Sequence, residues 1–127
     1  GEGYTNVTVC CTIENQARAT DRLEIFQSLK IPHKQIVCQP LVEKITIEEY
    51  LDGIGCVVVG GESAREARVL DYDWVLDIRQ QCMNQKVEFQ FRQCGTNFLM
   101  DGNVYRLQTK NLISQARKAS IDWKPGC

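Results

Sequence analysis

The sequence lacks several features that would assign it to a common class of protein. It has no apolar run long enough to cross a bilayer and no hydrophobic stretch typical of a secretory leader. Neither a Gly-x-Gly-x-x-Gly loop nor a Walker loop is present, which argues against a standard dinucleotide or nucleoside-triphosphate site. The net charge is −1, so no excess of positive charge indicates binding to nucleic acid or to an anionic membrane. We therefore expect a cytoplasmic protein.

Recognisable metal motifs are missing as well. His33 is the single histidine, and the seven cysteines form no Cys-x-x-Cys pair, so we expect no metal site. Cys10, Cys11, Cys38 and Cys56 lie inside apolar, strand-like runs, where a free thiol behaves as a small hydrophobic side chain. This usage is typical of a reducing compartment. We expect Cys38 and Cys56 to be buried and unbridged.

Short apolar runs alternate with helical patterns along the first three quarters of the chain. Asn15 and Asp71 stand where they can cap helices at residues 16–29 and 72–85, and Thr46 could cap a shorter helix that ends before Gly53. Asp101-Gly102 separates two short apolar runs and predicts a hairpin. Strands are predicted at residues 7–13, 34–41, 56–60 and 86–93, the hairpin at 97–108 and a last helix at 111–119.

This order of elements predicts an α/β fold that resembles half of a barrel. Four parallel strands should lie in the sequential order 1-2-3-4, in a βαβαβαβ arrangement with the helices on one face, followed by a β-hairpin and a C-terminal helix. We expect residues 1–127 to form a single domain. Its βα core spans about residues 5–95, the hairpin and last helix about 96–119, and a loose tail 120–127.

Polar side chains follow every predicted strand. Because parallel strands end at the same edge of a sheet, these residues should gather where α/β proteins bind ligands. Gly60 and Gly61 would also let a ligand approach the backbone closely. The candidate ligand-binding residues are Glu14, Asn15, Gln39, Gly60, Gly61, Glu62, Ser63, Arg65, Arg68 and Arg92.

Two kinds of chemistry are open to this edge. Arg65, Arg68 and Arg92 could hold phosphate or carboxylate groups, because a guanidinium binds both with two hydrogen bonds. Glu14 and Glu62 could instead act as an acid–base pair in a hydrolase. A serine triad is disfavoured, since no Gly-x-Ser-x-Gly is present. Catalytic residues are not assigned.

The motifs "TIENQ", "CQPL", "VVVGGES", "DYDWVLDIRQQC" and "VEFQFRQCG" follow one another between residues 7 and 95. In this order they resemble the C-terminal half of a phage-associated family of uncharacterised, radical-SAM-like (β/α)-barrel proteins. The resemblance continues more weakly to residue 119. It implies that the N-terminal half of a full-length member carries a three-cysteine motif for a [4Fe–4S] cluster that cleaves S-adenosylmethionine. The half represented here would help to line the pocket.

The resemblance places five residues at the mouth of the barrel: Glu14, Asn15, Glu62, Ser63 and Arg68. The sequence also departs from the family pattern. The cluster motif Cys-x-x-x-Cys-x-x-Cys is absent, Gln39 replaces the usual glutamate, Ala64 replaces a glycine and Cys94 replaces a tryptophan. We therefore expect no cofactor in this chain. S-Adenosylmethionine and the cluster are implied only for a full-length member.

Two hypotheses about function follow. The first is that the chain is the substrate-side portion of a radical-SAM-like phage protein and is inactive alone. The alternative is a small α/β module that binds an anionic small molecule or a protein partner at the carboxyl ends of its strands. A half-barrel also leaves open strand edges and one uncovered face. A homodimer that covers them is therefore expected, with a monomer covered by its own hairpin and last helix as the alternative.

Overall fold

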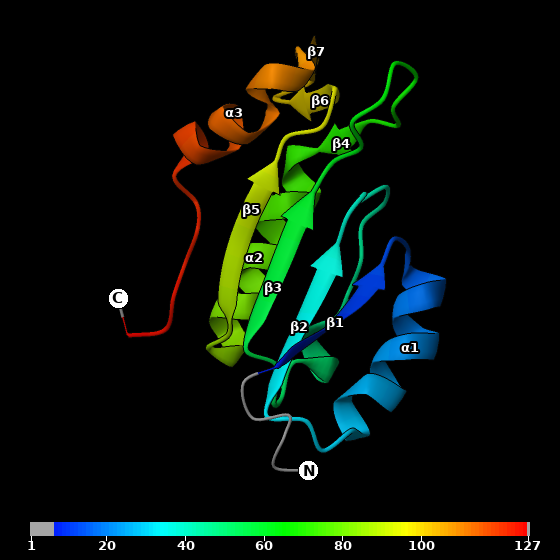
Figure 1. Ribbon diagram of the computed structural model, residues 1–127. Coiled ribbons are helices and arrows are strands. Elements are labelled where there is room, and N and C mark those ends of the chain that lie inside the picture. Colours follow the sequence, from blue (N-terminus) through cyan, green and yellow to red (C-terminus); the bar gives the residue numbers. More distant parts are fainter. Residues whose placement is uncertain (1–6, 127) are drawn as a thin grey trace.

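The computed structural model describes residues 7–126 and contains the predicted parallel sheet (Figure 1). Its strands are β1 (Thr8–Ile13), β2 (His33–Cys38), β3 (Cys56–Gly60) and β5 (Glu88–Gln93), all parallel and in the order β1-β2-β3-β5. These four strands thus follow their sequence order, without the reversal found in doubly wound folds. The prediction of a mixed α/β fold with a sequentially ordered parallel sheet is confirmed.

The first two long helices, α1 (Gln16–Ser28) and α2 (Tyr72–Gln85), pack on the same face of this sheet. Leu23 of α1 and Ile78 of α2 belong to one buried cluster that also contains Ile36, Val57 and Phe89 from three strands. These three strand residues are register partners and therefore point to the same side. Of the helices in residues 7–126, none covers the near face of β2 and β3 in Figure 1.

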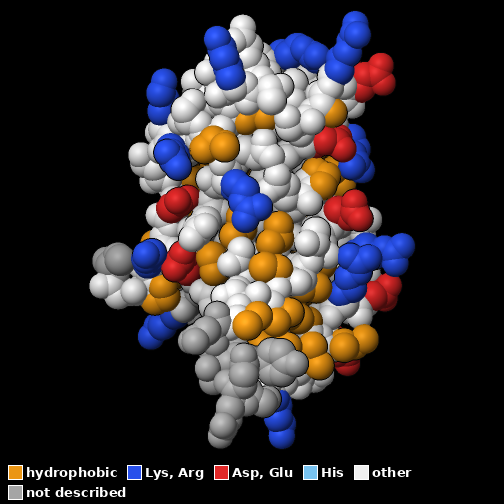
Figure 2. Space-filling view, viewed as in Figure 1, with side chains coloured by type: hydrophobic (Ala, Val, Ile, Leu, Met, Phe, Trp, Pro, Cys, Tyr) orange, Lys and Arg blue, Asp and Glu red, His pale blue; other side chains and the backbone are white. Residues whose placement is uncertain are grey.

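The uncovered face carries the alternate residues of each strand. One row across it consists of Cys10, Gln35, Cys56 and Glu88, which are successive register partners. Figure 2 shows apolar side chains on this side of the molecule, interrupted by polar and charged groups. Cys56 is therefore only half-buried, and the prediction that it is buried is wrong, because its side chain points away from the helices. Its thiol lies 3.8 Å from the carboxylate of Glu88.

The other cysteines agree better with the sequence. All six cysteines in the described part of the chain are free, and Cys38 is fully buried as predicted. Burial raises the pKa of the Cys82 thiol to about 12 and that of Cys94 to about 11, and it raises the pKa of Cys38 as well. These thiols stay protonated at neutral pH. Cys127 lies outside the described residues.

Capping side chains mark the start of both long helices. The Asn15 carboxamide oxygen accepts a hydrogen bond from the Arg18 N–H, and the Asp71 carboxylate accepts one from the Asp73 N–H, each at 2.9 Å. Both predicted caps are confirmed. Among helices in residues 7–126, none is long and apolar enough to cross a membrane.

The predicted cap at Thr46 is wrong. The segment forms a single 3₁₀ turn, η2 (Glu48–Tyr50), with Ile47 at the capping position and no side-chain cap. Thr46 is engaged elsewhere: its N–H donates to the Gln16 side chain at 2.7 Å, and its carbonyl accepts from the same side chain at 3.1 Å. These bonds tie the connection between β2 and β3 to the start of α1.

A second, smaller sheet follows. The predicted hairpin is β6 (Asn97–Met100) and β7 (Asn103–Arg106), paired antiparallel. Asp101 and Gly102 turn the chain with φ angles of 52° and 80°, as a two-residue hairpin loop requires. The two-residue strand β4 (Leu70–Asp71) pairs parallel to β6 and was not predicted. It links the start of α2 to the hairpin.

The chain then forms a 3₁₀ turn, η3 (Thr109–Asn111), and the predicted last helix, α3 (Leu112–Ala119), and returns along β5. Trp123 and Phe89 exchange two backbone hydrogen bonds, of 2.8 and 2.9 Å. The Asp122 carboxylate also accepts a bond from the Phe91 N–H at 2.8 Å. The expectation of a loose tail is therefore wrong for Asp122 and Trp123, because they bond to the outer edge of β5.

Candidate functional site

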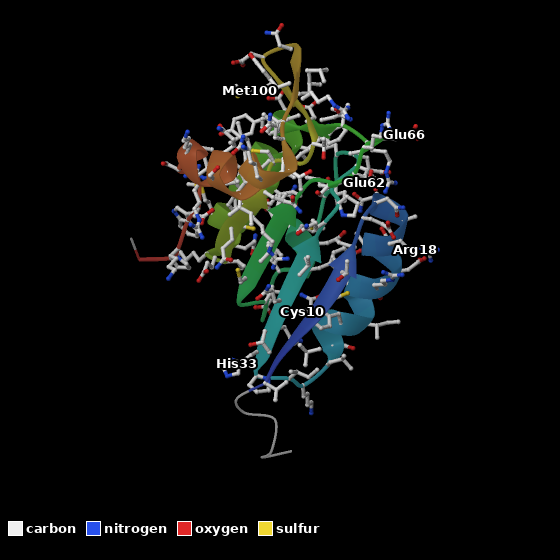
Figure 3. All side chains as sticks on the ribbon, turned by 45° about the horizontal axis from the view of Figure 1, so that its top comes forward. Cys10, Arg18, His33, Glu62, Glu66 and Met100 are labelled. Carbon is white, nitrogen blue, oxygen red and sulfur yellow. The ribbon has the colours of Figure 1, made fainter. Side chains whose placement is uncertain are left out.

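The carboxyl ends of the four parallel strands lie at one edge of the sheet, near the hairpin (Figures 1 and 3). Gln39 follows β2 and Arg92 lies near the end of β5, on either side of β3. The Arg92 guanidinium donates to the Gln39 carboxamide oxygen at 3.3 Å. The structure thus brings together two candidate residues that are far apart in the sequence, and this bond spans the end of β3.

The paired glycines after β3 have a packing role. A Cβ at Gly61 would lie 2.6 Å from the Cα of Gly95 and 2.7 Å from the Cys94 carbonyl oxygen. A Cβ at Gly60 would lie 2.9 Å from the side chain of Gln39. The Gly61 N–H donates to the Gln93 carbonyl at 3.1 Å, which fastens the two chain segments together. The backbone of Cys94 and Gly95 thus packs directly against Gly61.

Glu62 and Arg68 close the loop that follows. The Glu62 carboxylate accepts the backbone N–H of Arg68 at 2.8 Å and two guanidinium N–H groups at 3.3 and 3.1 Å. These hydrogen bonds lower the pKa of Glu62, and together with the nearby charge they raise the pKa of Arg68, with a smaller contribution from Glu14. Glu62 therefore stays ionised near neutral pH, which does not fit a general acid.

The hairpin supplies residues that sequence reasoning missed. Thr96 is buried, and its hydroxyl accepts the Ala64 N–H at 3.2 Å. Asn97 donates to the Ala67 carbonyl at 2.6 Å, and Arg106 donates to the Arg65 carbonyl at 2.9 Å. Three hairpin-side residues thus hold the loop between β3 and β4. The turn at residues 101–102 predicts the register that places Asn97 opposite Arg106, but it does not indicate that the hairpin contacts this loop.

Between this loop and the hairpin lies a cavity of about 560 Å³. Arg65 and Arg106 contribute the two charged groups of its lining, and no carboxylate lines it. The cavity is lined by Ala64, Arg65, Thr96, Arg106, Leu107, Gln108 and Thr109. Of the ten candidate residues, only Arg65 is among them. The hydroxyl groups of Thr96 and Thr109 and the carboxamide of Gln108 can also donate hydrogen bonds, beside the two guanidinium groups.

The family model described as "Protein of unknown function (DUF5131)" matches residues 2–121. The chain belongs to this family. None of the curated proteins and none of the solved structures searched matches it.

The remaining candidate residues of this DUF5131 chain lie outside the cavity lining. Asn15 is occupied as the cap of α1. Glu14 is half-buried, and Ser63 is exposed after the glycine pair. Figure 3 shows Glu62 at this edge of the sheet, with Glu66 farther out on the same loop. The edge is therefore divided between an internally bonded part around Glu62 and a free cationic part around Arg65.

The described residues of this DUF5131 chain do not fit an iron–sulfur cluster. Within residues 7–126, no three His, Cys, Asp or Glu side chains converge as a metal site. A cluster needs several thiolates around one centre. Cys38, Cys82 and Cys94 are buried with raised pKa values, so their thiols are protonated and are not available as thiolate ligands.

Proposed function

We propose that this DUF5131 chain binds the anionic group of a small molecule at the carboxyl edge of its sheet. The observation that carries the proposal is the cavity lined by Arg65 and Arg106 with no carboxylate beside them. A guanidinium offers five N–H donors in a plane and matches phosphate and carboxylate groups. Thr96, Gln108 and Thr109 add polar groups that can orient the bound anion.

The charge balance of the edge favours an anion in this cavity. Arg68 is neutralised by Glu62, and Arg92 donates to the uncharged side chain of Gln39. Within residues 7–126, Arg106 donates to a backbone carbonyl and to Asn97, and neither bond compensates its positive charge. Local positive potential concentrates anions even where the net charge of the protein is close to zero.

The cavity walls are also held in place before a ligand arrives. Thr96 and Arg106 fasten the loop at Ala64 and Arg65, while the Glu62–Arg68 pair closes its other end. A site whose side chains are already positioned loses less conformational entropy on binding. Such preorganisation is typical of a binding site and is consistent with ligand binding at the carboxyl ends of parallel strands.

The same proposal includes the larger context that the sequence resemblance implies. The chain would be the substrate-side portion of a radical-SAM-like, phage-related barrel protein, without activity by itself. What supports this is the sequential parallel order of the sheet with helices on one face, as in part of a (β/α) barrel. S-Adenosylmethionine and the [4Fe–4S] cluster would then belong to a longer member. An in-frame three-cysteine motif upstream of Gly1 would support this context, and a natural start codon there would contradict it.

Anion binding is tested by calorimetric titration with pyrophosphate and, separately, with citrate. The informative variant is Arg65→Gln, because no hydrogen bond of the Arg65 side chain holds the described fold together. Arg18→Gln on α1 is the matched control, since it removes the same charge from an exposed helix position (Figure 3). We expect saturable binding of at least one probe at one site per chain. Arg65→Gln should weaken it about tenfold.

Two results would contradict the proposal. If Arg18→Gln weakens binding as much as Arg65→Gln, the probes respond only to overall charge. If neither probe binds at low ionic strength, where electrostatic attraction is strongest, the edge has no anion site. Arg106→Gln serves as a second variant, and we expect it to weaken binding further because Arg106 also positions Arg65.

A further inference from the structure

A second cavity lies on the other side of the hairpin and has a different character. Its volume is about 400 Å³, within the range of small-molecule sites. Its walls come from the end of β5, the start of α2, the hairpin and one side of α3. Most of the lining is apolar. The residues are Tyr72, Phe91, Cys94, Phe98, Met100, Tyr105, Leu107, Gln115, Lys118 and Ala119.

Three aromatic rings form the inner wall. The ring centroids of Tyr72 and Phe98 are 5.5 Å apart, and Phe91 lies 6.3 Å from each of them. The ring of Tyr72 is tilted by 40° relative to that of Phe91 and by 55° relative to that of Phe98. In such tilted arrangements, ring edges and faces remain available to pack against the aromatic ring of a ligand. Met100 adds a flexible, polarisable side chain that adapts to a flat apolar ligand.

The rim of the cavity is positive. Lys118 lines it from α3, and no carboxylate is among the lining residues. Gln115 lies one helical turn before Lys118 and provides a carboxamide beside it. Burial raises the pKa of Tyr72, so its hydroxyl remains protonated and can donate a hydrogen bond. The cavity thus combines aromatic walls with donors and one cation near its mouth.

We propose that this cavity binds a small aromatic molecule that carries one anionic group. The aromatic ring would pack against Tyr72, Phe91 and Phe98, and a carboxylate or sulfonate would lie near Lys118. An apolar cavity that is left open to water loses the dispersion contacts that a ligand would restore. The site differs from the cavity at Arg65, with which it shares only Leu107.

A pair of fluorescent probes separates the two halves of this proposal. 8-Anilinonaphthalene-1-sulfonate carries the aromatic system and a negative charge, and N-phenyl-1-naphthylamine carries the same aromatic system without the charge. Each is titrated into the full chain while its emission is followed. We expect both to bind at one site per chain. Lys118→Gln should weaken binding of the sulfonate about twofold to fivefold, as for an exposed ion pair, and leave the neutral probe unchanged.

Two further variants fix the location. Ala119→Leu adds bulk to the cavity wall at the end of α3, and we expect it to reduce the binding of both probes strongly. Arg117→Gln removes a charge from the neighbouring exposed position, which does not line the cavity, and should change neither titration. Far-ultraviolet circular dichroism of each variant verifies that the chain is folded.

The proposal is overturned by any of three outcomes. The first is that neither probe binds the native chain. The second is that Ala119→Leu binds both probes as tightly as the native chain does. The third is that Lys118→Gln and Arg117→Gln change the affinity for the sulfonate equally. The second outcome would place the bound probe on another apolar surface, such as the helix-free face of the sheet. Lys118→Gln alters an exposed side chain and is expected to fold, so the charge test stands even if Ala119→Leu does not fold.

Discussion

Replacing Gly61 with alanine places a methyl group where the loop after β3 touches the loop after β5. The new Cβ would lie 2.6 Å from the Cα of Gly95, 2.7 Å from the Cys94 carbonyl oxygen and 2.9 Å from the Gly95 nitrogen. All three atoms belong to the backbone, so no side-chain rotation relieves the overlap. The two loops must separate, which strains the hydrogen bond between the Gly61 N–H and the Gln93 carbonyl.

Overpacking in a close-packed interior costs about 1–3 kcal/mol, and this site belongs at the upper end because the neighbours are backbone atoms. We therefore expect Gly61→Ala to lower the free energy of unfolding by about 2–3 kcal/mol, measured by urea denaturation followed by circular dichroism. Anion binding at Arg65 should weaken too, since the same loop carries that residue.

Gly55→Ala is the matched control. A Cβ at Gly55 would meet only the Lys34 carbonyl oxygen at 3.5 Å, an ordinary contact, and its φ angle lies outside the region that favours glycine. This substitution should change the free energy of unfolding by no more than about 0.5 kcal/mol. Equal stability of the two variants would refute the steric account of the glycine pair.

Three other predictions concern charge, thiols and the tail. The pKa of Glu62 is lowered in the folded chain, so the carboxylate stabilises the fold above its ordinary value of 4.5, and this contribution is lost as the pH falls through the folded-state pKa. Acid denaturation curves of Glu62→Gln should consequently show a weaker pH dependence than those of the native chain; identical curves would refute this. Ellman's reagent should react first with exposed Cys10 and reach Cys38 only on unfolding, and fast reaction of Cys38 would contradict its burial. Trp123→Pro removes the N–H that bonds to the Phe89 carbonyl and should cost about 1 kcal/mol more in denaturant than Trp123→Phe; equal losses would show that this backbone pair contributes little.

The sequence was sufficient for the features that depend on local patterns. Apolar runs and turn residues predicted the four parallel strands, and their alternation with helices predicted the sequential order. Asn15 and Asp71 begin their helices because their side chains bond to N–H groups two or three residues later. The hairpin at Asp101-Gly102 follows from the same local chemistry. Each of these features is decided within one element or between neighbouring elements.

The features that were missed depend on contacts between distant segments. β4 has two residues, too few for any periodicity, and exists because β6 lies beside it. Asp122 and Trp123 belong to the segment predicted as a loose tail, and their order depends on hydrogen bonds to the edge of β5, a distant strand. Arg106 reaches the loop at Arg65 across 41 positions of sequence, and no local pattern in either segment indicates that pairing.

The occupied edge of β5 limits how copies of this chain can add to one another. Within residues 7–126, β1 has β2 as its single strand neighbour, whereas the outer side of β5 is bonded to the tail. Through the four-stranded sheet, a molecule can join one other molecule at its β1 edge, and the joined sheet then has no further edge to offer. For the predicted homodimer, light scattering should therefore reach a plateau at twice the chain mass as concentration rises. A variant whose tail no longer bonds to β5 would expose the second edge of this sheet, and the same association would then continue to grow, because each added molecule would bring another unpaired edge.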